Sequence, residues 1–449
     1  MSQPQRSHSR AVPPAHPSPA MPLRWRIAVF LFFAAGLNYA DRVALSSVIP
    51  PLREDLGITD AQIGFAGMIF LWAYAIVSPF AGLMADRFSR SRLVVLSLVA
   101  WSAVTVLTGF AESFAVLVLA RFLLGIAESF YLPAAGALLA DHHGPASMGR
   151  AVSVHMLGLN LGLVLGGAAA GMLAEHYGWR LGFWLLGGLG LLLAVVGRGV
   201  LRDGPELGVP GSQADVPAPA QPAVAKVGLR EAWGYLLQVR SFHCLLMSSM
   251  AAGVAVWIFL SWLPLFLSET YGMGLGAAGI SAVLLYKAPV FVGIALGGWL
   301  SDWWVRRDPR ARVLVKGLSF VLGAPFLALF LGTPGFTVVV VIMVASSLLR
   351  AMGTPSEHPI ISETVPPPYR AAAIGILNTV GTGAGGVGVL VAGIFKGQYG
   401  LHLIFGACSV VYFIAGVLML LAYRKWIHQD LERARRFTSG GAQPAVGAA

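Results

Sequence analysis

The chain has 449 residues, of which 57% are hydrophobic and only 11% are charged, and its mean hydropathy is +0.74. Soluble domains carry about 25% charged residues, so this composition excludes an ordinary soluble enzyme or binding module. The formal net charge of +11 would suit a nucleic-acid-binding protein, but the positions of the basic residues argue against that function.

The first 22 residues are rich in proline and serine and lack the apolar core of a signal peptide. We therefore expect a disordered cytoplasmic tail over residues 1–23. Apolar runs follow, each close to the ~20 residues that cross a bilayer. They lie near residues 25–50, 62–86, 92–111, 113–141, 149–174, 180–200, 242–268, 278–303, 313–332, 336–362, 370–395 and 401–424. The sequence thus predicts an all-α polytopic membrane protein with twelve transmembrane helices.

A Pro/Ala/Gly-rich stretch between residues 201 and 240 divides these spans six and six. We expect a cytoplasmic linker there, whose end from Leu229 to Val239 forms a short amphipathic helix. The same division predicts a six-helix unit at 24–200, a second at 241–424 and a cytoplasmic tail at 425–449.

Most of the 31 Lys and Arg residues lie in the tails and in alternate loops. The opposite loops hold only Arg53, Arg180 and Lys396. This asymmetry follows the positive-inside rule and predicts that both termini are cytoplasmic, in a multi-pass protein of the inner (plasma) membrane. The basic charge therefore indicates topology, and we expect the lipid bilayer, not a nucleic acid, as the partner.

The two halves share an internal repeat. GLMADRFSRSR begins at Gly82 and GWLSDWWVRRD at Gly298, and each has Asp four residues after Gly and Arg four residues after Asp. RFLLGIAE and RAMGTPSE likewise place Glu128 seven residues after Arg121 and Glu357 seven residues after Arg350. Matching elements in two six-helix halves indicate a duplicated transporter fold with its site between the halves.

These motifs resemble the major facilitator superfamily, whose fold is two six-helix bundles that work by alternating access. Within it, NYADRVALS, FLWAYAI, RFLLGIAES and FLSWLPLFLSETYGM resemble the anion:cation symporter branch, which moves sugar acids and other small organic anions with protons. The first and third of these, with GWRLGFWLLGGLGLLLA, are also similar to spinster-like lysolipid transporters.

Asp41 and Arg42 lie side by side within the first apolar run, where charge is costly and is usually functional. Neighbouring side chains on a helix point ~100° apart, so the two residues cannot neutralise each other along the helix. Counting residues from the apolar boundaries places Asp41 and Arg121 at similar depth and Glu128 about two turns deeper. We therefore expect a cross-helix contact between Asp41 and Arg121.

The spans hold more basic than acidic side chains, and protonation of the acidic ones raises the positive charge of a pocket and attracts an anion. The resemblance implies that Asp41 and Glu128 handle protons and that Arg42 and Arg121 bind the anion. Second-half charges are Lys287, Arg350 and Glu357. The alternative interpretation is that all these residues form fixed ion pairs that only orient helices.

Further residues are expected to shape the pocket or control its opening. The predicted substrate-binding set is Arg42, Arg121, Tyr74, Asn160, Asn378, Thr379, Trp257 and Lys287, although polar residues in spans also serve helix packing. The resemblance implies a cytoplasmic conformational latch at Gly82, Asp86, Arg87 and Arg90, repeated at Asp302 and Arg306. The alternative for the latch set is ordinary loop charge of positive-inside topology.

The sequence contains no metal-ligand spacing and no catalytic arrangement. We expect a monomeric secondary transporter, not an enzyme, that moves a small organic anion with protons and needs no other cofactor. The alternatives are a spinster-like lysolipid or amphiphile carrier, a drug or metabolite exporter, and a membrane sensor that does not transport.

Overall fold

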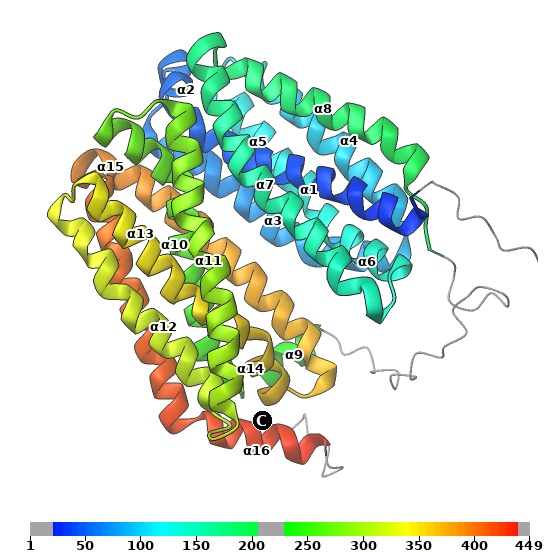
Figure 1. The fold of residues 1–449 in the computed structure, drawn as a ribbon, viewed down its shortest axis with the longest axis vertical. Coiled ribbons are helices and arrows are strands. Elements are labelled where there is room, and N and C mark those ends of the chain that lie inside the picture. The colour runs from blue at the N-terminus through cyan, green and yellow to red at the C-terminus, as the bar shows by residue number, and fades with distance from the viewer. Residues whose placement is uncertain (1–20, 205–228, 439–449) are drawn as a thin grey trace, which may run out of the picture.

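The computed structural model describes residues 21–204 and 229–438, and nearly all of them are helical (Figure 1). The elements in chain order are α1 (Leu23–Ser47), α2 (Ile49–Leu56), α3 (Asp60–Arg87), α4 (Arg90–Thr108), α5 (Phe114–Ser129), α6 (Tyr131–His142), α7 (Pro145–Tyr177), α8 (Trp179–Val200), α9 (Leu229–Leu236), α10 (Arg240–Tyr271), α11 (Leu275–Val305), α12 (Ala311–Ala328), η1 (Leu329–Gly332), α13 (Phe336–Met352), η2 (Thr354–Ser356), α14 (Glu357–Thr364), α15 (Pro367–Lys425) and α16 (Ile427–Thr438).

Within these described ranges, eleven helical stretches are long and apolar enough to cross a membrane. The longest of them, α15, changes direction at Gly400, where φ is 72° and ψ is 160°. Glycine adopts this conformation without the steric cost of a Cβ. Because α15 therefore holds two spans, the structure agrees with the twelve crossings that the sequence predicts.

The helices form two bundles, α1–α8 and α10–α15 (Figure 1). Between the bundles, α3 packs against α15 and α7 packs against α11. Gly167 of α7 faces the backbone of Gly279, and Gly171 faces the backbone of Leu275. Small residues let helix backbones approach closely in a membrane. These contacts lie toward the end of the molecule that carries α2, which we call the α2 side.

The opposite end, which we call the α6 side, is where α1 begins and α6 ends. His143 follows α6, and its Nε2 lies 3.1 Å from the carbonyl oxygen of Arg24 at the start of α1. The two bundles diverge toward this side in Figure 1. Positions in the functional site are given below as nearer the α2 side or nearer the α6 side.

Within the first bundle, α1 and α7 are in close contact. A Cβ added at Gly158 would meet the backbone of Phe32, and one added at Gly162 would meet the backbone of Gly36. The glycines of α7 thus fix how near α1 lies, and α1 carries Asp41 and Arg42.

The first span is longer than its apolar run suggests. Helix α1 ends at Ser47, but α2 continues to Leu56 and accommodates Pro50 and Pro51 in its first turn, where proline is tolerated. At 1.5 Å per residue, Asp41 lies about 22 Å below Leu56, and Glu128 lies about 21 Å below Phe114. The prediction that Glu128 lies two turns deeper than Asp41 is therefore wrong.

Two short helices cover the α6 side of the second bundle. The ring of Tyr235 in α9 stacks on that of Tyr369 at 4.5 Å, at the start of α15. Asp430 of α16 accepts hydrogen bonds from the Ser241 backbone N–H at 2.8 Å and from its hydroxyl at 2.7 Å. Helix α9 occupies most of the stretch where the sequence predicts an amphipathic helix. Residues 1–20, 205–228 and 439–449 of the predicted tails and linker lie outside the described residues.

Candidate functional site

The centre of the site is an ion pair between α1 and α5. Nε of Arg42 donates to Oε2 of Glu128 at 2.7 Å, and the two side chains are 4% and 0% exposed. The rings of Tyr39 and Tyr74 each lie 4.5 Å from the Arg42 guanidinium carbon. Cation–π attraction of this kind is strongest where water is excluded. Nη2 of Arg42 has no hydrogen-bond partner among the described residues, so one donor group remains free.

Asp41 and Arg121 do not form the predicted contact. No ion pair joins them in the part of the chain that the structure describes, and Oδ1 of Asp41 and Nε and Nη2 of Arg121 have no partner there. Oδ2 of Asp41 instead accepts a hydrogen bond from Thr105 of α4 at 3.1 Å. The physical reason is the extension of the first span through α2, which brings Arg42 to the depth of Glu128 and leaves Arg121 nearer the α2 side.

Arg121 is thus a buried cation with free donors. Its side chain is 2% exposed, and its guanidinium carbon lies 5.7 Å from the ring of Phe183. A buried charge is costly unless it is paired or meets a ligand. This guanidinium is therefore suited to an anionic group that enters from the cavity.

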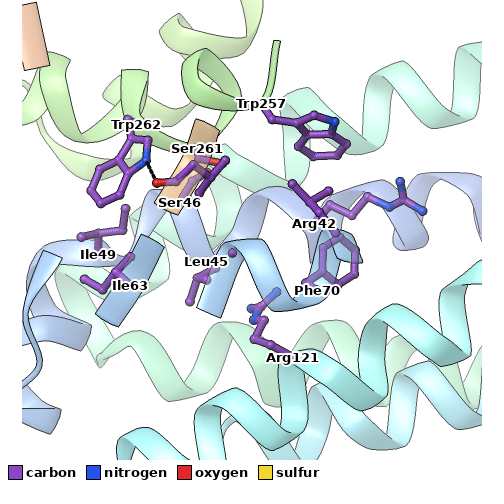
Figure 2. Close-up of a pocket in the computed structure, with 13 residues that line it drawn as sticks. Arg42, Leu45, Ser46, Ile49, Ile63, Phe70, Arg121, Trp257, Ser261 and Trp262 are labelled. Carbon is purple, nitrogen blue, oxygen red and sulfur yellow. Dashed lines mark hydrogen bonds between the residues drawn. The ribbon is translucent and has the colours of Figure 1, made fainter. Parts of the chain in front are cut away.

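Two cavities meet at Arg42. The larger, of about 460 Å³, extends toward the α6 side and is lined by both bundles: Tyr39, Arg42, Tyr74, Ala75, Ser78, Pro79, Leu132, Pro133, Trp257, Gly375, Asn378, Thr379 and Thr382. The smaller, of about 40 Å³, lies toward the α2 side. Figure 2 shows Arg42, Arg121, Trp257 and Trp262 around it. Since Arg42 and Trp257 line both cavities, they separate the two.

The predicted pocket residues divide into two groups. Tyr74, Trp257, Asn378 and Thr379 line the larger cavity. Asn160 does not line either cavity, and its amide donates to the carbonyl of Met156 on its own helix at 2.8 Å. The structure therefore does not bring Asn160 to the cavities at Arg42.

Sequence reasoning missed four residues around the site. Tyr39, Ser78 and Thr382 line the larger cavity, and Thr105 holds Asp41. Tyr39 was accessible from the sequence because it precedes Arg42 by three residues and so shares its face of the helix. The other three carry no signal beyond being polar residues in apolar spans.

The second-half charges are not brought to this site. The Tyr286 ring lies 5.5 Å from the guanidinium carbon of Arg350 and 5.9 Å from Nζ of Lys287. Neither residue lines the two cavities. Glu357 pairs instead with Lys316, whose side chain is 2% exposed. The prediction of Lys287 as a cavity residue is therefore not supported by this geometry.

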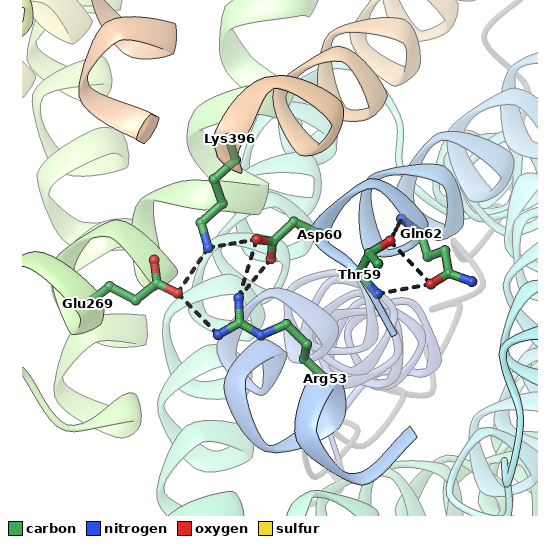
Figure 3. A network of polar contacts seen from close by, with 6 residues as sticks. All are labelled: Arg53, Thr59, Asp60, Gln62, Glu269 and Lys396. Atoms are coloured by element: carbon green, nitrogen blue, oxygen red, sulfur yellow. Dashed lines mark hydrogen bonds and ion pairs between the residues drawn. The ribbon is translucent and has the colours of Figure 1, made fainter. Parts of the chain in front are cut away.

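Four charged residues join the two bundles on the α2 side, and we call them the closing network (Figure 3). Arg53 and Asp60 belong to the first bundle, and Nη1 of Arg53 lies 3.1 Å from Oδ1 of Asp60. Glu269 and Lys396 belong to the second, and they lie 2.9 Å apart. Across the bundles, Lys396 reaches Asp60 at 3.0 Å and Arg53 reaches Glu269 at 3.6 Å. Within the described ranges, every ion pair between the bundles lies here.

The predicted latch residues on the α6 side are not assembled in this structure. Asp86 and Arg87 are exposed and have no ion-pair partner within the described residues. Arg90 pairs instead with Asp141, at the end of α6. A Cβ at Gly82 would meet open space.

The second copy of the latch is also open. Asp302 pairs with Arg312 on the same bundle, at 3.3 Å with 72% of the Asp302 side chain exposed. Arg306 has no ion-pair partner in the described part of the chain. No latch residue therefore crosses between the bundles on the α6 side.

A different carboxylate holds the loop between α3 and α4. Asp203, which follows α8, accepts hydrogen bonds from the Ser89 hydroxyl and from the Ser91 backbone N–H. Burial raises the pKa of Asp203, but these hydrogen bonds and the nearby Arg92 outweigh it, so the pKa is lowered. The loop is thus anchored within its own bundle at neutral pH.

A buried polar site between two six-helix bundles, closed on one side and reached by a cavity from the other, is the arrangement of a membrane transporter. The sequence pattern of the Major Facilitator Superfamily matches residues 31–344 and 307–445, and the chain belongs to this family.

Individual proteins of known or probable transport function are similar to this chain over most of its length. The chain is 26% identical to the "probable galactarate/D-glucarate transporter GudP" of Bacillus subtilis (strain 168), over 89% of this chain and 92% of that protein. It is 24% identical to the "hexuronate transporter" of the same organism, over 88% and 92%. A crystal structure of "a bacterial homolog to human lysosomal transporter, Spinster" in an inward-facing conformation covers 95% of this chain and is itself fully covered, with a TM-score of 0.73 and 22% identity. These relatives are transporters, not enzymes, and the structural likeness supports the fold.

Proposed function

We propose that the protein is a secondary transporter that moves a small organic anion together with protons. The observation that carries this proposal is the pair of buried guanidinium groups with free donors, Nη2 of Arg42 and Nε and Nη2 of Arg121, beside the buried carboxylates Asp41 and Glu128. Guanidinium groups bind carboxylates through paired, charge-assisted hydrogen bonds.

The charge balance supports coupling to protons. Arg42 and Glu128 neutralise each other, so the net charge of the site depends on Asp41 and Arg121. When Asp41 is protonated the site carries a net positive charge and attracts an anion. When Asp41 loses its proton the site is neutral overall, and the anion is released. Thr105 donates a hydrogen bond to Asp41 at 3.1 Å.

The substrate class follows from the lining of the larger cavity. Asn378, Thr379 and Thr382 offer amide and hydroxyl groups, and Tyr39, Tyr74 and Trp257 offer aromatic faces. Such a lining suits a hydroxyl-bearing acid, with the acid group on arginine and the hydroxyl groups on the polar residues. The names of relatives that carry galactarate, D-glucarate and hexuronate point to the same class.

The structure then represents the state that opens toward the α6 side. Basic residues gather in the loops on that side, so we propose that it faces the cytoplasm, that both termini are cytoplasmic and that the protein works as a monomer in the inner membrane. The closing network shuts the opposite side. The latch residues Asp86, Arg90 and Asp302 would then meet new partners only when the bundles rock to the outward-open state.

The proposal is tested with purified protein in liposomes that contain a trapped pH dye. Galactarate, D-glucarate, D-glucuronate and a lysophospholipid are added outside without an imposed gradient. Uptake with protons makes the interior more acidic when a transported acid is added, and the trapped dye reports this change. A response to lysophospholipid with none to the acids would contradict the proposal and favour an amphiphile carrier.

The variant Asp41→Asn tests proton coupling separately from binding of the anion. Because an amide cannot release a proton, we expect this variant to lose accumulation driven by a pH gradient while it still exchanges labelled anion across the membrane. Uptake and exchange of the accumulated acid are measured in parallel at equal protein density. An Asp41→Asn protein that still concentrated the acid under a pH gradient would overturn the assignment of Asp41.

A further inference from the structure

The first bundle holds a set of buried polar residues that the substrate site does not use. Asn38, Trp101 and Tyr131 are 0% exposed and His155 is 3% exposed. None of them lines either cavity at Arg42. Polar groups away from water are costly unless they form hydrogen bonds, and within a membrane they usually mark a pathway.

These residues form a chain of contacts that begins at Asp41. The hydroxyl oxygen of Thr105 lies 3.1 Å from Oδ2 of Asp41 and 3.0 Å from the carbonyl oxygen of Trp101 one turn away, so its single proton is shared between the two acceptors. The ring of Trp101 lies 5.2 Å from that of Tyr131, edge to face. The Tyr131 hydroxyl donates to the carbonyl oxygen of Leu31 at 2.9 Å, and its oxygen lies 3.1 Å from Nε2 of His155.

Asn38 occupies the interval between the two ends of this chain. It precedes Asp41 by three residues and follows Leu31 by seven, so it lies on α1 between Asp41 and the Tyr131 hydroxyl. Both polar atoms of its amide lack a partner in the described structure, as do Nε1 of Trp101 and Oδ1 of Asp41. Unpartnered donors and acceptors in one buried region are satisfied by water, which supplies both functions.

The chain runs toward the α6 side. Asp41 lies 18 residues from the start of α1, about 27 Å at 1.5 Å per residue, whereas His155 lies 10 residues from the start of α7, about 15 Å. Both helices begin on the α6 side. The polar residues therefore descend from Asp41 by roughly 12 Å inside the first bundle, alongside the substrate cavity but separate from it.

We propose that Asn38, Tyr131 and His155 form a relay that conducts the coupling proton between Asp41 and the α6 side, so that the proton and the anion leave by different routes. This inference rests on the proposed proton coupling. Asp41 gives its proton to water held by Asn38. The Tyr131 hydroxyl turns from the Leu31 carbonyl, passes its proton to Nε2 of neutral His155 and takes up the proton from that water. The imidazolium then releases a proton to water. The net result is an Asp41 carboxylate and one proton on the α6 side.

The charged groups around Asp41 favour the release of its proton when an anion binds. Asp41 has Arg42 beside it on α1 and Glu128 and Arg121 on α5, with Thr105 facing it from α4. Since Arg42 is engaged by Glu128, the arrival of an anion at Arg121 leaves Asp41 as the group that can change its charge. His155 has only Tyr131 as a hydrogen-bond partner among the described residues, through Nε2, so its other ring nitrogen, Nδ1, is left to exchange a proton with water.

The test compares Asn38→Leu, Tyr131→Phe and His155→Gln with wild type in liposomes loaded with pyranine. For galactarate, D-glucarate or D-glucuronate, whichever the wild type accumulates, two rates are measured: uptake driven by a pH gradient and exchange without one. Because a relay acts on proton transfer, we expect gradient-driven uptake to fall by about tenfold or more while exchange stays within about twofold of wild type. Tyr412→Phe, a buried tyrosine of the second bundle, is the matched control and should keep both rates.

If another variant fails to fold, His155→Gln is the decisive one, since glutamine can still hydrogen-bond to the Tyr131 hydroxyl but cannot carry a proton. Unchanged gradient-driven uptake in this variant, or an equal loss of uptake and exchange at a wild-type melting temperature, would overturn the relay alone. A wild-type protein whose uptake ignores the pH gradient would overturn the proposed proton coupling, and the relay with it.

Discussion

At the scale of single residues, the site is built on one buried ion pair whose partners depend on each other. Arg42 and Glu128 are almost fully enclosed and joined at 2.7 Å. Removing one member of such a pair leaves an uncompensated buried charge, whereas removing both leaves none. The pair is therefore expected to act as a unit in stability as well as in binding.

We predict that Arg42→Gln and Glu128→Gln each lower the stability of the protein by about 3–5 kcal/mol, because each leaves the other charge buried and alone. The double variant Arg42→Gln/Glu128→Gln should recover most of this loss. Thermal unfolding in detergent measures all three proteins. Losses that simply add in the double variant would show that the two side chains do not depend on each other.

The sequence locates these charges but not their partners. Asp41, Arg42, Arg121 and Glu128 stand out because charge is rare in apolar spans, and that argument needs no structure. To predict which of these charges pair, one must know how deep in the membrane each residue lies on its helix. Proline at positions 50 and 51 suggests that the first helix ends there, although the chain remains helical through α2 to Leu56.

At the scale of helices, the distance between α1 and α7 is set by glycines of α7. Gly162 lies against the backbone of Gly36, so a side chain there has no room. Gly188 of α8 borders open space, with no atom within 4 Å of the place a Cβ would take, and serves as a matched position in the same bundle.

We predict opposite effects for two alanine substitutions. Gly162→Ala should cost about 1–3 kcal/mol of stability, because the added Cβ forces α1 and α7 apart. Gly188→Ala should be neutral or should stabilise by up to about 1 kcal/mol, because alanine favours the helix over glycine. Melting temperatures in detergent distinguish the two, and a Gly162→Ala protein as stable as Gly188→Ala would contradict the close contact.

Apolar run length predicts the helices well and their interruptions poorly. The spans near 62–86 and 92–111 correspond to α3 and α4 within a few residues. The break between α5 and α6 at Phe130, and the short η2 segment before Glu357, leave no mark in hydropathy. Such breaks depend on contacts with neighbouring helices, which hydropathy does not report.

At the scale of the whole molecule, the closing network ties the two bundles together on one side only. Its cross-bundle partners are far apart in sequence, 336 residues in the case of Asp60 and Lys396. Charged residues at that separation carry no pairing signal in one sequence. Which side of the transporter is closed can therefore be seen only from a structure that contains both bundles.

We predict that Glu269→Gln/Lys396→Gln shifts the protein toward opening on the α2 side, because it removes both cross-bundle ion pairs but keeps the pair of Arg53 with Asp60. A cysteine at Ser261, which lines the smaller cavity, reports the opening through its reaction with a charged maleimide. The two native cysteines are buried. At about 0.2–1 kcal/mol for each pair, the two pairs together are worth about 0.4–2 kcal/mol, so the labelling rate should rise roughly two- to thirtyfold.

The control is Asp55→Asn/Arg180→Gln, which removes an ion pair that lies within the first bundle on the same side. It should leave the labelling rate near that of the protein carrying only the Ser261 cysteine. Equal rates in all three proteins would show that the closing network does not hold the α2 side shut.

The hydrogen bond between α16 and the start of α10 has a consequence during protein synthesis. Backbone N–H groups in the first turn of a helix lack partners within that helix, and the one at Ser241 is satisfied by Asp430, 189 residues later. At 5–20 residues per second, translation leaves the start of α10 uncapped for about 10–40 s. The second bundle is thus completed only after all twelve spans have left the ribosome, and a message truncated before codon 430 would yield twelve spans whose seventh never gains its cap.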